Sequence, residues 1–195
     1  MAGAFRRTVL IVAILNLAYF GVEFAVAQAI GSVSLFADSV DFLEDTSINL
    51  LIFFAAGWSI RRRSIVGSVL ALVILVPALA TVVTAVIKII DPLPPEPVPL
   101  SLTAFGALVI NVTCAVLLVR HRNRQGSLAK AAWLSARNDA FANVAIIAVA
   151  GLTVLIPTGW LDIVVGLAIA ALNADAAVKV WSSARAERSE PKPEA

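Results

Sequence analysis

The sequence contains few charged residues and a single cysteine, and each shortage excludes a class of protein. Charged residues make up 14% and hydrophobic residues 60% of the 195 positions, whereas a soluble domain is about a quarter charged and roughly half apolar. This composition excludes a disordered chain, a collagen and a nucleic-acid-binding protein, and it indicates an integral membrane protein. The one cysteine, Cys114, excludes an intrachain disulfide and a thiolate metal cluster.

Six apolar runs, each bounded by charges or by proline and glycine, predict an all-α integral membrane protein built as a six-transmembrane-helix bundle. The runs cover about residues 8–30, 33–60, 64–90, 98–119, 128–156 and 160–181. We expect residues 1–184 to form one transmembrane domain and residues 185–195 a short disordered cytoplasmic tail.

The first run has a second interpretation, a cleaved signal peptide, because Arg6 and Arg7 precede it and alanines occupy positions 25 and 27. A signal peptide usually has an uncharged apolar region of about 7–15 residues. The run here is longer and contains Asn16 and Glu23, so we interpret it as the first membrane helix.

Basic residues gather on one side of the predicted bundle and account for the net charge of +2. The side shared by both termini carries Arg6, Arg7, Arg61, Arg62, Arg63, Arg120, Arg122, Arg124, Lys130, Lys179, Arg185, Arg188 and Lys192. The opposite side consists of the Gly31-Ser32 turn, a stiff proline-rich loop over residues 91–97 and a turn over residues 157–159, with Lys88 as its flanking base. Because basic loops stay in the cytoplasm, we expect both termini to be cytoplasmic. The membrane is expected to be a bacterial cytoplasmic membrane.

The second run contains four acids within eight residues, Asp38, Asp41, Glu44 and Asp45. At about 100° per residue, Asp38, Asp41 and Asp45 lie within an arc of about 60°, with Glu44 on the other side of Asp41. Ionisable groups inside a membrane are costly unless they face a partner, a cavity or water. Like charges also repel, so this stripe persists only if cations or protons occupy it. The pattern therefore predicts a cation site.

The fifth run supplies a second stripe of oxygen donors, because Ser135, Asp139 and Asn143 recur every four residues. Arg137 lies about 160° around the helix from Asp139, so we expect it to neutralise Glu44, to snorkel or to pair with another helix. The weaker candidates for the metal site are Asp38, Asn138, Asn143 and Glu44.

The competing interpretation is structural, because polar side chains often join membrane helices through hydrogen bonds. This role suits Asn16, Asn49, Asn111, Asn143 and Asn173 at least as well as a functional one. For Asp38 and Glu23 the two interpretations are equally open. For Asp41, Asp45 and Asp139 the structural role is disfavoured, because Arg137 is the main donor that the chain offers at that depth.

Several segments resemble the cation diffusion facilitator family of metal/proton antiporters. The segment Gly31-Ser32-Val33-Ser34-Leu35-Phe36-Ala37, followed by Asp41 and Asp45, resembles the family's second helix with its Asp-x-x-x-Asp pair. Asn16, Glu23, Asn111 and the run Trp160-Leu161-Asp162 also stand where the family tends to have such residues. The resemblance covers residues 8 to about 184.

The resemblance implies a four-ligand metal site at Asp41, Asp45, Ser135 and Asp139. Many members have a histidine where this chain has Ser135, and the change leaves only oxygen ligands. Zinc favours nitrogen and sulfur ligands, whereas an all-oxygen site suits harder ions such as Mn²⁺ or Mg²⁺, with Fe²⁺ or Co²⁺ as further candidates. The segment 61–63 also lacks the His and acidic ligands that some members carry there.

The family's C-terminal cytoplasmic metal-sensing domain has no counterpart in the 195 residues, so the chain is expected to be a short form. A homodimer, if kept, would then form through membrane helices, with the third as the candidate.

The function that the resemblance implies is export of a divalent transition-metal cation from the cytoplasm in exchange for protons, by a secondary transporter that is not an enzyme. Its partners would be the lipid bilayer, the metal, protons and a second copy of the chain; whether the metal is Mn, Fe, Co, Zn or Cd is left open. One alternative is a non-transporting membrane subunit of a larger complex. The other is an intramembrane aspartyl hydrolase using Asp45 and Asp139 as a dyad, although no Asp follows a Gly-x-Gly segment.

Overall fold

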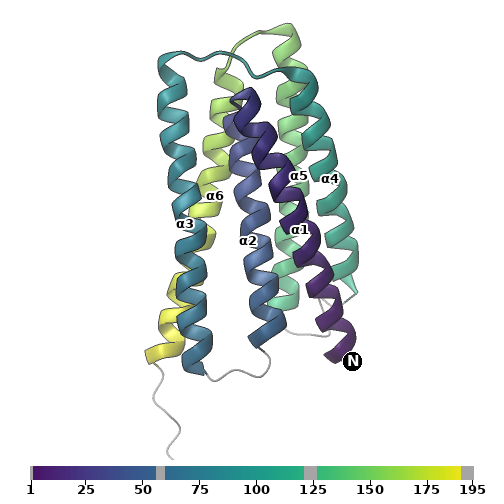
Figure 1. Ribbon diagram of the computed structural model, residues 1–195, viewed down its shortest axis with the longest axis vertical. Coiled ribbons are helices and arrows are strands. Elements are labelled where there is room, and N and C mark those ends of the chain that lie inside the picture. The colour runs from purple at the N-terminus through teal and green to yellow at the C-terminus, as the bar shows by residue number, and fades with distance from the viewer. Residues whose placement is uncertain (1, 56–59, 121–126, 190–195) are drawn as a thin grey trace, which may run out of the picture.

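The computed structural model describes residues 2–55, 60–120 and 127–189. These residues form six helices, α1 Ala2–Ile30, α2 Val33–Ala55, α3 Ile60–Ile90, α4 Pro97–Val119, α5 Ser127–Leu155 and α6 Trp160–Ser189 (Figure 1). The helices have 23 to 31 residues, or about 35–46 Å at about 1.5 Å per residue, which exceeds a bilayer core of about 30 Å. The predicted all-α six-helix bundle is confirmed.

The helices extend beyond the apolar runs at the basic end of the bundle. α1 begins at Ala2, and α6 continues to Ser189, so residues 185–189 of the expected tail are helical. The rest of that tail, residues 190–195, lies outside the described residues. A helix satisfies its own backbone hydrogen bonds, so it can continue from the membrane into water without a change of structure.

The helices run alternately up and down, and α2 is central among them. α2 contacts α1, α3, α5 and α6, while α3 pairs with α6 and α4 pairs with α5. In Figure 1 the α3–α6 pair stands to one side of α2 and the α4–α5 pair to the other, with α1 crossing in front. The N-terminus and the C-terminal end of α6 lie at the same end, called the N-terminal end below. The opposite end, called the far end, carries the α1–α2, α3–α4 and α5–α6 connections.

The α1–α2 turn at the far end is set by local sequence. Gly31 has a φ of 63°, a left-handed conformation that commonly ends a helix. The backbone N–H of Ser32 then donates to the carbonyl of Ala27 at 3.1 Å, and the Ser32 hydroxyl accepts the Leu35 N–H at 3.1 Å. These contacts close α1 and cap α2 within two residues, so the acidic stripe of α2 lies directly beside α1.

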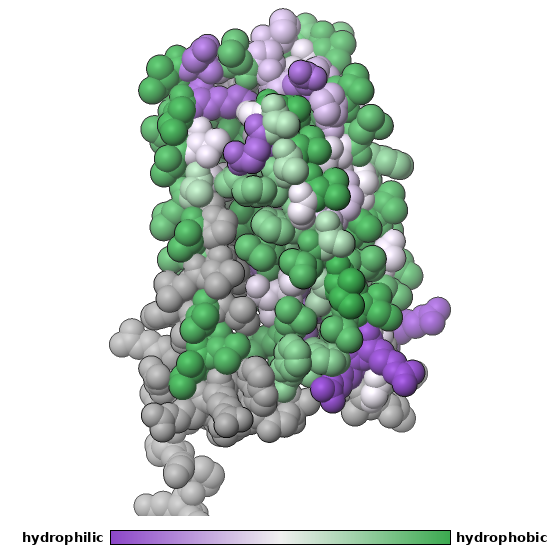
Figure 2. Space-filling view, viewed as in Figure 1, coloured by the Kyte–Doolittle hydropathy of each residue, from purple (hydrophilic) through white to green (hydrophobic). Residues whose placement is uncertain are grey.

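The exterior of the bundle is largely apolar. Figure 2 shows hydrophobic side chains over most of the visible face, with hydrophilic ones near its two ends. Large apolar side chains such as Val76, Val98 and Val154 are exposed on three different helices. An apolar surface of this extent is suited to lipid rather than to water.

Within the described residues, three helical segments are long and apolar enough to cross a membrane by length and composition, Gly3–Ile30, Pro97–Val119 and Ala132–Leu155. Leu79–Ile90 and Trp160–Leu172 are shorter apolar stretches. α2 carries four acids, which lowers its hydropathy although it lies at the centre of the bundle.

Within the described residues the interior has three apolar clusters, one of which consists of Val33, Ala85 and Ile163. Polar side chains lie between the other two. One of these two, toward the far end, includes Leu35, Leu100 and Ile146. The other, toward the N-terminal end, includes Val9 and Leu118. The polar side chains buried between these clusters are Asn16, Glu23, Asp38, Asp45, Asn111 and Asn143, which come from α1, α2, α4 and α5. The interior therefore has a polar layer at the middle of the bundle, enclosed by apolar packing at both ends.

Candidate metal centre

Asp45 on α2 is held by side chains from two other helices. The Ser135 hydroxyl on α5 donates to Asp45 Oδ1 at 2.9 Å, and Asn16 Nδ2 on α1 donates to Asp45 Oδ2 at 3.4 Å. Asn16 Oδ1 in turn accepts a weak hydrogen bond from Cys114 Sγ on α4 at 3.7 Å. Asp45 is thus fixed in orientation by α1 and α5, at the point where four helices meet.

Asp41 and Asp139 form the second half of the predicted site. Asp41 interacts electrostatically most strongly with Asp139, and both also interact with Asp45. Asp41 and Asp139 are partly exposed, whereas Asp45 is buried at 3% exposure. Asp41, Asp45 and Asp139 are therefore electrostatic neighbours, and the Ser135 to Asp45 hydrogen bond is the direct contact between α2 and α5 among the four predicted ligands.

These carboxylates are neighbours, but their oxygens are not arranged around a common position for a metal ion. Among the residues that the structure describes, no group of three or more His, Cys, Asp or Glu side chains is placed closely enough to hold a metal ion. Both Asp45 oxygens accept hydrogen bonds instead. Each carboxylate oxygen has a second lone pair that remains free to bind a metal ion, so metal binding at these residues would need the carboxylates to move closer together.

The weaker candidates divide into two groups. Glu44 is buried and interacts with Asp45, so it borders the site. Asn138 is exposed, and its Oδ1 accepts a hydrogen bond from Arg137 Nη2 at 3.2 Å. Arg137 also lies over the ring of Trp133, 5.3 Å from its centroid. Asn138 is therefore turned away from the carboxylates, and Arg137 is occupied on the outside of α5.

Asp38 and Asn143 belong to a second polar cluster, one turn closer to the far end. Asn143 Nδ2 on α5 donates to Asp38 Oδ2, and Asn143 Oδ1 accepts from Asn111 Nδ2 on α4 at 3.0 Å. Glu23 on α1 lies against Asp38. Glu23 and Asp38 both have 0% exposure. The hydrogen bonds of this cluster do not include Asp45, so the cluster is separate from the group formed by Asp45, Ser135 and Asn16.

The sequence as a whole matches a known transmembrane family. The family model of the cation efflux transmembrane domain matches residues 9–187. The chain belongs to the cation efflux family. This membership confirms the predicted resemblance to the cation diffusion facilitators, and no curated protein gives a significant match.

Membership of the cation efflux family establishes the general activity. The protein is an integral membrane transporter of metal cations, and the cations that the family carries are divalent. Members of the cation efflux family are transporters and not enzymes, so the aspartyl hydrolase alternative is dropped.

Two contacts of the site were missed in the sequence. From the sequence a structural role suits Asn16 at least as well as a functional one; the structure shows that it donates to the carboxylate of Asp45, a partner that the sequence does not indicate. Glu23 was left open, and its partner Asp38 was assigned weakly to the metal site rather than to a pair with Glu23. One sequence feature could have indicated these contacts: Asn16 and Glu23 are seven residues apart, so both lie on the same face of α1.

Proposed function

We propose that this cation efflux protein exports a divalent transition-metal cation from the cytoplasm in exchange for protons. The ion would be bound by Asp41, Asp45 and Asp139, with Ser135 or water in the remaining position. The observation that supports this most is the 2.9 Å hydrogen bond between Ser135 and Asp45. It joins the two helices that carry all four residues, so a small movement of α5 against α2 would change how many carboxylates can reach one ion.

Exchange with protons follows from the chemistry of the ligands. Metal ions and protons both bind carboxylate oxygens, so binding of one displaces the other. A site that opens to each side in turn would take up metal on one side and protons on the other, as rocking bundles do in other transporters. No Walker-type Gly-x-x-x-x-Gly-Lys segment occurs in the sequence, so the proposed energy source is the proton gradient rather than ATP.

The choice of metal depends on the oxygen ligands. Asp41, Asp45, Ser135 and Asp139 offer carboxylate and hydroxyl oxygens and no nitrogen. Such a set favours Mn²⁺, with Fe²⁺ and Co²⁺ next, over Zn²⁺ and Cd²⁺, which bind more tightly to nitrogen or sulfur. Cys114 does not change this preference, because its sulfur contacts Asn16 rather than a carboxylate.

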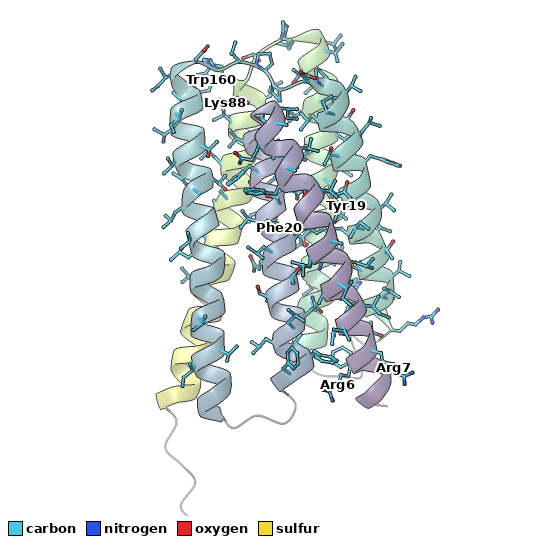
Figure 3. The ribbon with its side chains drawn as sticks, viewed as in Figure 1. Arg6, Arg7, Tyr19, Phe20, Lys88 and Trp160 are labelled. Atoms are coloured by element: carbon cyan, nitrogen blue, oxygen red, sulfur yellow. The ribbon has the colours of Figure 1, made fainter. Side chains whose placement is uncertain are left out.

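The proposed orientation places both termini in the cytoplasm of a bacterium. Arg6 and Arg7 stand at the N-terminal end, and Lys88 and Trp160 both lie at the far end (Figure 3). The excess of arginine and lysine at the N-terminal end in the sequence supports a cytoplasmic location for that end.

A homodimer is part of the same proposal. α3 exposes Val76, Val83 and Ile87, and their spacing places them on one side of the helix. A second copy of the chain would pack against this side of α3.

The test is metal flux into proteoliposomes under an imposed pH gradient. Mn²⁺, Fe²⁺, Co²⁺, Ni²⁺, Zn²⁺ and Cd²⁺ would each be supplied alone, to the wild type and to Asp45→Ala. Asp91→Asn is the control, because Asp91 is an exposed acid of the α3–α4 loop. Gradient-dependent flux that is lost in Asp45→Ala and kept in Asp91→Asn would support the proposal and identify the metal. No flux of any ion by folded wild-type protein would favour a non-transporting subunit instead.

A further inference from the structure

Glu23 on α1 and Asp38 on α2 form a buried pair of carboxyl groups that the proposed metal site does not use. Both side chains have 0% exposure. Within the described residues, Glu23 Oε1, Glu23 Oε2 and Asp38 Oδ1 are buried without a hydrogen-bond partner. The two carboxyl groups lie within reach of each other, and these three buried oxygens accept no hydrogen bond from any other described side chain or backbone group.

The surroundings of this pair are polar and fixed. Asp38 Oδ2 accepts from Asn143, which is itself held by Asn111 at 3.0 Å. Asn143 therefore orients the Asp38 carboxylate and leaves Oδ1 free. Tyr19, one turn from Glu23 on α1, interacts with both acids and is seen near mid-height of the bundle in Figure 3. Its hydroxyl donates to the Thr103 carbonyl at 2.7 Å, so it does not hydrogen-bond to the pair.

The charges around the pair make it hard to keep both groups ionised. The electrostatic neighbours that act most strongly on Glu23 are Asp38 and Asp41, which are also acids. Lys88 is bound to Asp162 at the far end, and Arg137 lies over Trp133 on the exterior. Buried carboxylates inside a membrane protein require a cation, a proton or strong donors. The pair has oxygens that are free to bind a cation. It has no Lys or Arg side chain beside it among the described residues that would take the place of that cation.

The position of the pair relates it to the first site. Asp38 precedes Asp41 by three residues, or about 4.5 Å along α2 toward the far end. Asn143 follows Asp139 by four residues on α5, which runs in the opposite direction, so it is displaced toward the same end. The two clusters therefore lie one above the other along the axis of the bundle.

We propose that Glu23 and Asp38 form a second binding position for a divalent cation, beyond the Asp41–Asp45–Ser135–Asp139 site and closer to the far end. Glu23 supplies two oxygens and Asp38 supplies Oδ1, while Asn143 keeps the Asp38 carboxylate turned toward Glu23. Two carboxylates neutralise one divalent ion, and oxygen ligands suit the same hard cations as the first site. This proposal rests on the proposed function, because its ligand is the transported ion. The ion would occupy this position on its way out of the cytoplasm.

The experiment counts bound metal ions on the purified full-length protein. Mn²⁺, Co²⁺ or Zn²⁺, each alone, is brought to saturation by equilibrium dialysis in detergent, and bound metal per chain is measured by elemental analysis. The variants are Glu23→Gln, Asp45→Ala and both together. Glu96→Gln is the matched control, because it makes the same chemical change at an exposed residue. Asp38→Asn tests the same position independently, in case Glu23→Gln does not fold.

We expect two ions per chain in the wild type and in Glu96→Gln, one in Glu23→Gln, one in Asp45→Ala and none in the double variant. A Glu23→Gln or Asp38→Asn variant that binds as many ions as the wild type overturns the proposal and assigns a shared proton to the pair. The outcome is separable from the proposed function. If the wild type transports metal but Glu23→Gln binds as many ions as the wild type, the second position is rejected and the transport proposal stands. If Glu23→Gln loses one bound ion but the wild type shows no flux, the second position stands and the transport proposal is rejected.

Discussion

Lys88 Nζ on α3 lies 2.9 Å from Asp162 Oδ2 on α6, and the same carboxylate also binds the N-terminus of α2. Asp162 accepts the backbone N–H of Val33 at 2.8 Å and the hydroxyls of Ser32 at 2.7 Å and Ser34 at 2.6 Å. One buried acid thus ties three helices together at the far end. The α3–α6 pair is therefore attached to the first turn of α2, just before the acidic residues of that helix begin.

We expect Asp162→Ala to destabilise the protein by about 3–5 kcal/mol, because it leaves Lys88 and several backbone and hydroxyl donors without their acceptor. Asp162→Asn should cost less, since the amide oxygen still accepts some of these hydrogen bonds. Thermal unfolding in detergent, followed by circular dichroism, measures the difference. Asp91→Asn, at an exposed acid near the same end, should unfold as the wild type does. Equal unfolding temperatures for Asp162→Ala and Asp91→Asn would show that the network does not hold the helices together.

Much of the fold and part of the site could be predicted from the sequence, because both depend on periodicity along one helix. Apolar runs give the six helices, and a repeat of about 3.6 residues places Asp41 beside Asp45 and Ser135 beside Asp139. The contact between Ser135 and Asp45 follows once α2 and α5 face each other. Asn138 is the counterexample. It is adjacent to Asp139, but one residue is about 100° around the helix, and the structure turns it to the exterior.

The contacts between helices could not be predicted, because they depend on which faces pack together. Glu23 and Asp38 are fifteen residues apart in the sequence and meet only because the tight turn at Gly31 folds α1 back along α2. Asp162 is more than a hundred residues from Ser32, and no pattern in either segment indicates that one binds the other. A single sequence offers no signal for such pairs.

Cys114 should be unreactive in the folded protein. Its side chain has 0% exposure and its sulfur contacts Asn16 Oδ1. Because it is the only cysteine in the chain, maleimide labelling of the wild type should be slow in detergent and fast after unfolding in SDS. Mass spectrometry of the intact chain gives the labelled fraction over time. Rapid labelling of the folded protein would mean that α1 and α4 separate readily at this depth.

Gly106 on α4 and Tyr19 on α1 should be energetically coupled. A Cβ atom at position 106 would lie 2.1 Å from the Tyr19 hydroxyl oxygen, so Gly106→Ala displaces the tyrosine from the Thr103 carbonyl. We expect a loss of about 1–3 kcal/mol, as for overpacking elsewhere. In a Tyr19→Phe background the clashing oxygen is gone, so the same substitution should cost less.

The coupling is measured by a double-mutant cycle on unfolding free energies, which for residues in contact is about 0.5–3 kcal/mol. Gly151→Ala is the matched control, because a Cβ atom there meets nothing within 4 Å. If Gly106→Ala costs as much with phenylalanine at position 19 as with tyrosine, the close approach of α1 and α4 at this level is not what limits position 106.

Ser135→His should change the metal preference of the transporter. Ser135 donates to Asp45 at 2.9 Å, so an imidazole at the same position would add a nitrogen ligand beside the three carboxylates. Zinc favours nitrogen, whereas manganese favours oxygen. We expect the ratio of Zn²⁺ to Mn²⁺ flux to rise by at least about tenfold, which corresponds to about 1.4 kcal/mol of added preference.

Two further substitutions at position 135 distinguish the effect of the histidine nitrogen as a ligand from the effect of a larger side chain. Ser135→Ala removes the hydrogen bond and adds no ligand. Ser135→Asn adds volume and an oxygen ligand, but its amide nitrogen does not coordinate metals. Both should leave the Zn²⁺ to Mn²⁺ flux ratio near that of the wild type, even where total flux falls. If Ser135→His and Ser135→Asn give the same ratio in the proteoliposome assay, position 135 does not contact the ion, and the metal must be bound by Asp41, Asp45 and Asp139 without it.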